Sequence, residues 1–244
     1  MLLLVDAGNT RVKWAIAAPG AAPGDWVAHD AVLHADLKRL VPAWSGHGIT
    51  RAIVSNVAGA AVRAELEALL PVVPEWFASK PELAGLRNRY RNPGQLGSDR
   101  FAAALGARTL VPGQALVVAT CGTATTVDAV SADGEFIGGM ILPGLGLMLG
   151  ALARGTAQLP QVAAGDPPAL FADNTQDAIL SGCLSAQAGA IERAALAHGA
   201  ALCIVSGGAA GHVAPLLSVP CRLLDNIVLA GLHAAAPAME SRTC

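Results

Sequence analysis

The chain opens with two apolar runs on either side of a short polar segment. Residues 3–5 form a continuous apolar run, which is typical of a buried strand, and residues 12–16 alternate large apolar side chains with smaller or charged ones. The polar segment between them, residues 6–10, contains residue types that favour turns. The pattern predicts a β-hairpin.

The rest of the first half alternates strand and helix patterns. Residues 51–57 have the composition of a strand, and residues 60–70, rich in Ala, Leu and Glu, have helical periodicity. Residues 98–109 predict a second helix. The dipeptide Pro112-Gly113 closes this α/β unit, so we expect a domain boundary there.

The second half begins as the first does. An apolar strand at residues 114–118 leads into a turn rich in Gly and Thr at residues 122–128, and a further strand is predicted at residues 135–141. A later strand, residues 201–205, runs into the glycine-rich turn 206–210. The weak repeat predicts two similar lobes that hold one triphosphate from opposite sides. The glycine turn has two open interpretations: close approach to a flat ligand such as a purine, or a tight strand-to-helix connection.

One segment, residues 136–153, carries no charge and approaches the length of a membrane span. Several glycines and Pro143 interrupt it, which predicts a strand, a turn and a buried helix instead. The glycines at 144 and 146 lack the spacing of a dinucleotide-binding fingerprint, and the sequence contains no P-loop. A nucleotide site therefore needs another motif.

Composition favours a cytoplasmic protein that acts on a small molecule. The 244 residues are 53% hydrophobic and 14% charged, which is enough for a large core, and the net charge is −2. Lys and Arg are scattered, so nucleic-acid binding has no electrostatic support, and neither a signal segment nor membrane association is expected. The cysteines are expected to be reduced thiols, and neither they nor the histidines have the spacing of a zinc site or a catalytic triad. These residues are Cys121, Cys183, Cys203, Cys221 and Cys244, and His29, His34, His47, His198, His212 and His233.

The turn of the opening hairpin contains groups that suit a phosphate. Gly8 permits unusual backbone angles, so that successive N–H groups could form an anion-binding nest, while Thr10 adds a hydroxyl and Lys13 a positive charge. Asp6 is placed to hold Mg²⁺ through water. An ordinary Asn/Gly turn explains the same residues, and the hairpin motif alone does not decide between the two.

Several motifs in one order resemble those of the type III pantothenate kinases, members of the acetate and sugar kinase, Hsp70 and actin superfamily. The resemblance covers nearly the whole chain. It implies an α/β fold of two similar actin- or ribonuclease H-like lobes with an ATP cleft between them. It also implies ATP-dependent phosphorylation of pantothenate to 4′-phosphopantothenate, the first step of coenzyme A biosynthesis, by a cytosolic homodimer. The motifs are Asp6-Ala7-Gly8-Asn9-Thr10-Arg11-Val12-Lys13, Asn92-Pro93-Gly94-Gln95-Leu96-Gly97-Ser98-Asp99-Arg100, Gly122-Thr123-Ala124-Thr125-Thr126-Val127-Asp128, Gly138-Gly139 through Pro143-Gly144, and Ser206-Gly207-Gly208-Ala209.

The resemblance also implies the site residues. Those for ATP are Asp6, Ala7, Gly8, Asn9, Thr10, Arg11, Val12, Lys13 and Thr123. Those for pantothenate are Tyr90, Gly97, Ser98, Asp99, Arg100 and Thr175. Arg100 would hold the pantothenate carboxylate. Tyr90 is the only tyrosine and stands between two arginines, which indicates an exposed polar segment rather than core packing. Most of the rate acceleration is expected from alignment and charge neutralisation.

Asp99 corresponds to the proton acceptor of the family. It stands near a predicted helix start beside Arg100, and both the helix N-terminus and the cation would keep its carboxylate ionised. Without the family, the favoured interpretation is plain N-capping by Ser98 and Asp99. Asp128 has two open roles: it could organise water bound to Mg²⁺, or brace its turn through backbone hydrogen bonds.

One position departs from the family pattern. Many members carry a cation-binding aspartate two residues before the Gly-Thr of the second turn, and Thr120 stands there in this chain. A neutral hydroxyl is a poorer ligand than a carboxylate, so we expect the requirement for K⁺ or NH₄⁺ to be altered or weakened. Carbonyl oxygens could still build such a site.

The expected N-terminal lobe, residues 1–112, contains the phosphate hairpin and the pantothenate-binding segment. The expected C-terminal lobe, residues 113–244, contains the second phosphate turn, the adenosine-side glycine turn and a C-terminal helix. The apolar stretches 145–153 and 183–197 suit a subunit interface as well as a core. Residues 17–49 have no assigned role.

Two other functions stay open from the sequence. One is phosphorylation of another small molecule on the same fold, and the other is a non-catalytic transcription accessory role that keeps the fold. A non-catalytic relative should have lost part of the phosphate machinery, whereas Asp6, Lys13, Asp99 and Thr123 are all present. The sequence therefore favours catalysis.

Overall fold

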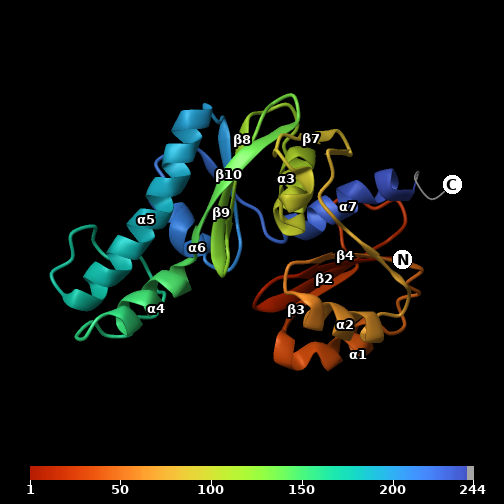
Figure 1. Cartoon of the computed structure of the whole chain (residues 1–244), viewed down its shortest axis with the longest axis horizontal. Coiled ribbons are helices and arrows are strands. Elements are labelled where there is room, and N and C mark those ends of the chain that lie inside the picture. Colours follow the sequence, from red (N-terminus) through yellow and green to blue (C-terminus); the bar gives the residue numbers. More distant parts are fainter. Residues whose placement is uncertain (241–244) are drawn as a thin grey trace. The chain divides into compact units, whose positions relative to one another are not determined.

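The computed structural model describes residues 1–240, which divide into two compact units (Figure 1). The first unit contains Met1–Pro112, Gly134–Phe136 and the segment that begins at Asn226. The second unit contains Gly113–Asp133 and Ile137–Asp225. The expected boundary at Pro112-Gly113 thus coincides with the end of the first unit's long segment.

The first unit is built on a five-stranded sheet with the order β3-β2-β1-β4-β5. β1 and β2 pair antiparallel, which confirms the predicted hairpin, and β4 and β5 continue the sheet in parallel with β1. The strands are Leu2–Ala7 (β1), Arg11–Ala17 (β2), Ala28–Leu33 (β3), Arg51–Asn56 (β4) and Pro74–Trp76 (β5).

The central strands are continuously apolar because other elements of the unit cover both faces of the sheet. One core cluster joins alternate residues of β1, β2 and β4 to side chains such as Leu37, Trp44 and Leu66. Leu4 and Ile53, at the intervening positions, are also fully buried, and α7 packs against β1 and β4. A strand buried on both faces has no polar side to alternate. The helices are His34–Arg39 (η1), Leu40–Trp44 (α1), Ala60–Leu69 (α2), Ser98–Leu110 (α3) and Ile227–Glu240 (α7).

α3 and α7 approach so closely that their backbones meet at two glycines. A Cβ at Gly231 would overlap the carbonyl of Ala102, and a Cβ at Gly106 would overlap the carbonyl of Ile227. The structure differs here from the predicted division of the chain, which places the C-terminal helix with residues 113–244. Backbone contact between these glycines makes α7 part of the first unit.

The second unit repeats the strand order of the first. Its strands follow the order β12-β11-β8-β9-β10, with an antiparallel β8–β9 hairpin and with β11 and β12 parallel to β8, as β4 and β5 are to β1. The predicted repeat is confirmed, and the Gly-Thr turn after β8 corresponds to the turn after β1. The strands are Leu116–Cys121 (β8), Ala124–Val130 (β9), Glu135–Pro143 (β10), Leu202–Ser206 (β11) and Cys221–Leu223 (β12).

β10 begins in the first unit, where Glu135 and Phe136 pair with β7 (Leu86–Asn88), the neighbour of β6 (Glu82–Leu83). Its remaining residues belong to the second unit and lead through Gly144 into a helix, which confirms the predicted order of strand, turn and helix. The prediction that this helix is buried is wrong, because only Leu145, Leu149 and Gly150 of it are buried. The helices of this unit are Leu145–Gly155 (α4), Thr175–His198 (α5), Ala210–Val213 (α6) and Ala214–Leu216 (η3).

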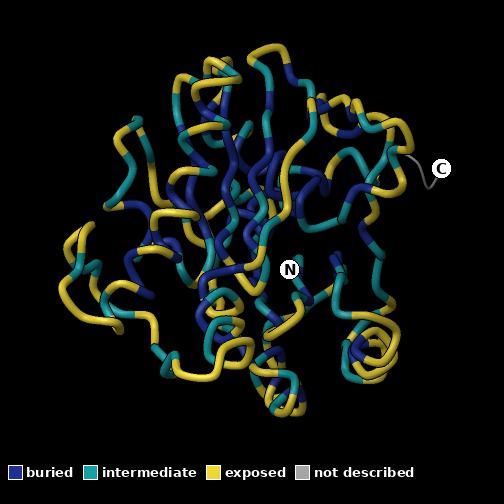
Figure 2. Tube along the Cα trace, turned by 60° about the vertical axis from the view of Figure 1, so that its left-hand side comes forward, coloured by how far each residue is buried: buried dark blue, intermediate teal, exposed yellow. Residues whose placement is uncertain are grey.

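Burial follows this architecture. In Figure 2 the buried positions run along the strands, and the connecting loops are largely exposed. The core of the second unit joins β8 and β11 to the inner side of α5, where Leu184 and Ile191 are almost completely buried. Among residues 1–240, no helix combines the length and the apolar character that a membrane span requires.

Candidate active site

Asp6 is the second-to-last residue of β1, close to the turn of the opening hairpin. In the sheet it stands opposite Lys13 on β2 and opposite Ser55 on β4. Its Oδ1 atom is buried and has no hydrogen-bond partner among residues 1–240. Burial and, to a lesser extent, the charge of Asp99 raise the pKa of Asp6 and the charge of Lys13 lowers it, so that the pKa is about 7. The strand end therefore carries a carboxyl group that lacks a compensating charge.

Gly8 does not have the unusual backbone that the sequence suggested. It is absent from the positive-φ glycines of the described chain, its N–H donates to the Arg11 carbonyl at 3.2 Å, and its own carbonyl accepts from His34 Nε2 at 2.8 Å. The prediction that Gly8 adopts such angles to build an anion nest is wrong, because the residue closes the turn instead. His34, which begins η1, braces this turn, and sequence reasoning assigned it no role there.

The segment from Gly97 to Arg100 forms the start of α3. Gly97 is the N-cap and makes no side-chain cap bond, while Asp99 Oδ1 accepts the Arg100 N–H at 2.8 Å. A Cβ at Gly97 would lie 2.6 Å from Asp99 Oδ1. Glycine at this position therefore leaves the space into which the carboxylate of Asp99 folds.

Asp99 is half-buried, and two opposing effects act on its pKa. Burial raises the pKa of Asp99, whereas the Arg100 N–H and the Arg100 charge lower it, as expected for the neighbouring cation. The effect of burial, which the sequence did not predict, is the larger, so the pKa lies above its ordinary value. The alternative of a plain N-cap is also not what the structure shows, since the N-cap is Gly97.

Tyr90 and Arg100 belong to one cluster with Phe136. Arg100 is 6% exposed and donates from Nη1 to Tyr90 Oη at 2.9 Å. Its guanidinium carbon lies 5.7 Å from the Tyr90 ring centre and 5.9 Å from that of Phe136, and the two rings meet edge to face. Arg89 and Arg91 are exposed, as predicted for this segment, while Tyr90 between them is half-buried, with Phe136 against its ring. The sequence offered no signal for Phe136, which reaches the cluster from β10.

In the second unit, three sequence motifs meet at the backbone of Cys121–Thr123. The Gly144 N–H donates to the Thr123 carbonyl at 2.9 Å, and a Cβ at Gly144 would overlap the Gly122 carbonyl. Gly207 has a φ of +98°, and a Cβ there would lie 2.5 Å from the Cys121 carbonyl oxygen. The glycines of these motifs thus bring the β8–β9 turn, the start of α4 and the β11–α6 turn together.

Three polar residues of β8 and β9 lie beside this turn: Thr120, Thr126 and Asp128. Thr120 is half-buried and stands opposite Thr126 in the β8–β9 ladder, where the Thr126 hydroxyl is buried without a hydrogen-bond partner among residues 1–240. Asp128 is 1% exposed. Across residues 1–240, no three His, Cys, Asp or Glu side chains gather as a metal cluster.

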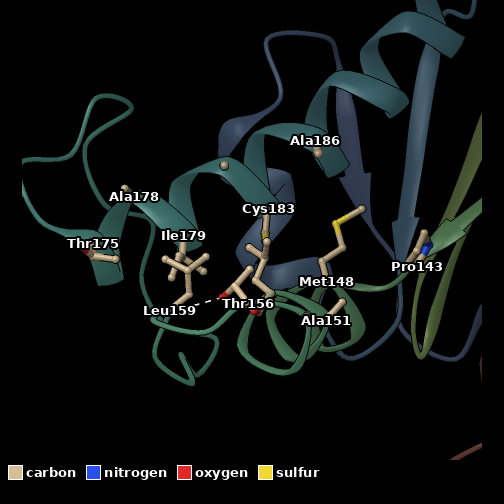
Figure 3. A pocket seen from close by; sticks show the side chains of 13 residues that line it. Pro143, Met148, Ala151, Thr156, Leu159, Thr175, Ala178, Ile179, Cys183 and Ala186 are labelled. Carbon is tan, nitrogen blue, oxygen red and sulfur yellow. Dashed lines mark hydrogen bonds between the residues drawn. The ribbon is translucent and has the colours of Figure 1, made fainter.

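Thr175 is the first residue of α5 and lies in the second unit, whereas Tyr90 and Asp99 lie in the first. The predicted pantothenate contacts are therefore divided between the units. Thr175 lines a cavity of about 770 Å³ between α4 and α5, whose other walls are mostly apolar, including Met148, Ile179 and Cys183 (Figure 3). Within it, the Leu159 N–H donates to Thr156 Oγ1 at 3.3 Å.

The described cysteines are free thiols, as expected: Cys121, Cys183, Cys203 and Cys221. Burial raises the pKa of both Cys121 and Cys203 to about 11, so that these thiols are protonated at neutral pH. Cys244 lies outside the described residues.

Comparisons of the sequence with a family model and with curated proteins identify one family. The family model for type III pantothenate kinase matches residues 2–198. A type III pantothenate kinase from Janthinobacterium sp. (strain Marseille) is 57% identical, with both chains covered completely, and one from Herminiimonas arsenicoxydans is 55% identical over 97% of each chain. Among solved structures, the activator of the 2-hydroxyisocaproyl-CoA dehydratase from Clostridium difficile with bound ADPNP has a TM-score of 0.56 at 14% identity. The alignment covers 98% of this chain and 94% of the activator. That likeness concerns the fold alone.

Proposed function

The chain belongs to the type III pantothenate kinase family, and we propose how its residues divide the work of phosphorylating pantothenate. The enzyme uses ATP to convert pantothenate to 4′-phosphopantothenate, the first step of coenzyme A biosynthesis. In this reaction the pantothenate hydroxyl oxygen bonds to the γ-phosphorus, the bond to the β–γ bridging oxygen breaks, and the hydroxyl proton leaves. The residues must therefore align the hydroxyl, accept its proton and neutralise phosphate charge.

Asp99 is the proposed proton acceptor, and its half-buried position near Asp6 is the observation that carries this assignment. A carboxylate with a raised pKa is a stronger base at neutral pH than an exposed one, and burial raises the pKa of Asp99. Gly97 leaves room for this carboxylate at the start of α3. The first turn of α3 therefore accommodates the carboxylate of the proposed base and has no side-chain N-cap.

Asp6 is the proposed Mg²⁺ residue, with water between the carboxylate and the ion. The fit rests on the structure: Asp6 Oδ1 is buried without a partner, and its pKa of about 7 shows that the ionised form lacks compensation. A bound cation would supply that compensation. When bound there, Mg²⁺ would neutralise charge on the phosphates. Lys13 and Thr10 of the hairpin, and Thr123 of the second unit, are the proposed phosphate contacts, together with the other residues of the Asp6–Lys13 segment.

Arg100 and Tyr90 are proposed to hold the pantothenate carboxylate. Arg100 is a buried cation fixed by its bond to Tyr90 Oη, and Tyr90 is fixed in turn by Phe136. A planar guanidinium presents several N–H donors in one fixed geometry, which suits a carboxylate. Gly97 and Ser98 of the same helix start, and Thr175 of the second unit, complete the proposed pantothenate set.

A homodimer is proposed from the apolar surface of the second unit. Ile141 on β10 and Leu147 on α4 are exposed by 65% and 44%, and the cavity between α4 and α5 is lined mainly by apolar atoms. An apolar surface of this kind is typical of an interface. A monomer mass in sedimentation at micromolar concentration contradicts this proposal.

A weakened requirement for a monovalent cation is proposed from Thr120, because a threonine hydroxyl carries no charge for K⁺ or NH₄⁺. The enzyme is further proposed to act in the cytoplasm without nucleic-acid or membrane partners, as its low net charge suggests. Activity that vanishes when both ions are replaced by a bulky organic cation, and returns with K⁺, contradicts the first of these proposals.

The test of the function is product formation from a panel of acceptors. The purified chain is incubated with ATP and Mg²⁺ in the presence of pantothenate, glucose or acetate, under both K⁺ and NH₄⁺ salts, and phosphorylated products are identified by mass. We expect product from pantothenate alone. Product from glucose or acetate in preference, or no pantothenate product under any salt, contradicts the assignment and returns the two alternatives that the sequence left open.

A further inference from the structure

Ser55 is a polar residue in a position where a small apolar residue would be ordinary. It lies one residue before the end of β4, is 0% exposed, and follows the apolar residues Ala52, Ile53 and Val54. In the parallel β1–β4 ladder it stands opposite Asp6. A buried hydroxyl needs a partner, because leaving it unpaired costs free energy.

The partner of Ser55 is on α3. Ser55 Oγ lies 2.8 Å from Ser98 Oγ, so one hydroxyl donates to the other. Ser98 is the first residue of α3 and directly precedes Asp99, and the N-cap Gly97 makes no side-chain bond of its own. The hydroxyl pair therefore ties the first turn of the helix to the strand that neighbours Asp6.

We propose that Ser55 is a positioning residue for phosphoryl transfer, which holds Asp99 in place beside the Asp6 strand end through its hydrogen bond to Ser98. This inference rests on the proposed role of Asp99 as proton acceptor. Ser55 is completely buried, so it has no surface to offer a substrate, and its hydroxyl acts through Ser98.

The physical reason for such a tether is the place of Asp99 in the first turn of α3. A shift of the helix start moves the Asp99 carboxylate with it, because Asp99 follows Ser98 directly. The hydroxyl pair opposes that shift without adding a charge. Small displacements of a reacting group cost large factors in rate, on the order of 100-fold for about 1 Å.

The test compares Ser55→Ala with two other variants. We expect Ser55→Ala to lower kcat by about 10- to 100-fold, with KM for ATP changed by less than about threefold, because the ATP contacts remain. Ser98→Ala removes the same bond from the half-buried side, and the double variant should lose no more than the larger single loss. Ser98→Thr keeps a hydroxyl and should restore most of kcat.

Ser181→Ala is the matched control. Ser181 is a buried serine of α5 whose hydroxyl donates to the Leu170 carbonyl at 2.7 Å, outside the proposed catalytic residues. Its loss should lower the melting temperature as a lost buried hydrogen bond does, with kcat unchanged. Loss of kcat in Ser55→Ala with a melting temperature no lower than that of Ser181→Ala separates positioning from folding.

Three outcomes overturn the inference: wild-type kcat in Ser55→Ala, additive losses in the Ser55/Ser98 double variant, or a loss in Ser98→Ala that Ser98→Thr does not restore. If Ser55→Ala does not fold, Ser98→Ala and Ser98→Thr decide with KM for pantothenate as a second readout: a lost tether lowers kcat with that KM unchanged, whereas a lost pantothenate contact raises it and overturns the inference. Asp99→Asn is measured alongside. Activity lost in Asp99→Asn but kept in Ser55→Ala refutes the tether and leaves the proposed function intact, whereas absence of pantothenate kinase activity in the wild type refutes the function itself.

Discussion

Asp99 raises the pKa of Asp6, although one lies in the first turn of a helix and the other is the second-to-last residue of a strand. The effect adds to that of burial, and together they outweigh the nearby Lys13. The first unit therefore places two acidic groups where both charged forms are disfavoured. Such a pair favours binding of a proton or a cation. The proposed reaction transfers a proton from the pantothenate hydroxyl and requires Mg²⁺.

The stability of the ligand-free protein should fall as the pH rises from about 4 to about 7. The pKa of Asp6 is about 7 in the folded state against an ordinary value of 3.8, so the folded chain binds more protons than the unfolded chain across this range. Asp99 acts in the same direction, because its pKa is also raised. Urea midpoints measured without Mg²⁺ should decline across the window for the wild type and decline less for Asp6→Asn. Parallel profiles for the two proteins contradict the raised pKa.

Gly97→Ala should damage catalysis more than stability. A Cβ at this position lies 2.6 Å from Asp99 Oδ1, so the carboxylate must move, while the helix itself can remain. We expect kcat to fall about 10-fold or more, since a displaced base loses alignment. Gly94→Ala is the control in the same segment, because its Cβ meets Asn92 Oδ1 at an ordinary 3.5 Å. Equal kcat values for the two variants would show that the space at Gly97 does not serve Asp99.

Gly231→Ala should destabilise the first unit. The added methyl group would overlap the Ala102 carbonyl on α3, and neither backbone can give way easily. Overpacking of this kind costs about 1–3 kcal/mol or more in the free energy of unfolding. Gly189→Ala on α5, where a Cβ meets nothing within 4 Å, should be neutral or stabilising by about 0.5–1 kcal/mol. Chemical denaturation of both variants measures the difference, and an unchanged midpoint for Gly231→Ala contradicts the close packing of α3 on α7.

His34→Ala should weaken ATP use through the hairpin turn. The imidazole bonds to the Gly8 carbonyl at 2.8 Å, and loss of one such bond costs about 1 kcal/mol, or roughly a fivefold change in KM for ATP. His34→Gln can donate from its amide and should recover part of the loss. His29→Ala removes an exposed histidine of β3, whose ring meets Trp26, and should leave KM unchanged. The hypothesis fails if His34→Ala and His29→Ala give the same KM for ATP.

Local patterns were enough to predict much of the fold. The hairpin of β1 and β2 and the helices α2 and α3 follow from apolar periodicity, and the repeated strand order follows from two similar strand-turn-strand segments. The position of α7 could not be predicted in this way. Its place depends on Gly106 and Gly231, which are 125 residues apart in the sequence and meet only in the folded chain.

The site shows the same division between local and long-range information. The sequence was enough to identify Asp6, Asp99, Tyr90 and Arg100 as candidate site residues. It gave no information on burial, which is the effect that raises the pKa of Asp99. Phe136, which packs on Tyr90, and Ser55, which bonds Ser98, come from distant strands. The prediction for Gly8 was wrong for a different reason. The residues around Gly8 are equally compatible with an ordinary turn, and an ordinary turn forms.

The role of Asp99 as the proton acceptor is tested by the steady-state kinetics of Asp99→Asn with pantothenate and saturating Mg²⁺. Asparagine keeps the size of the side chain but cannot accept the hydroxyl proton as a carboxylate does. A general base contributes about 100- to 10,000-fold to the rate, so we predict a loss of kcat in that range with KM for ATP within about twofold of the wild type. A kcat near that of the wild type would contradict the account and leave Asp99 with no part in proton transfer.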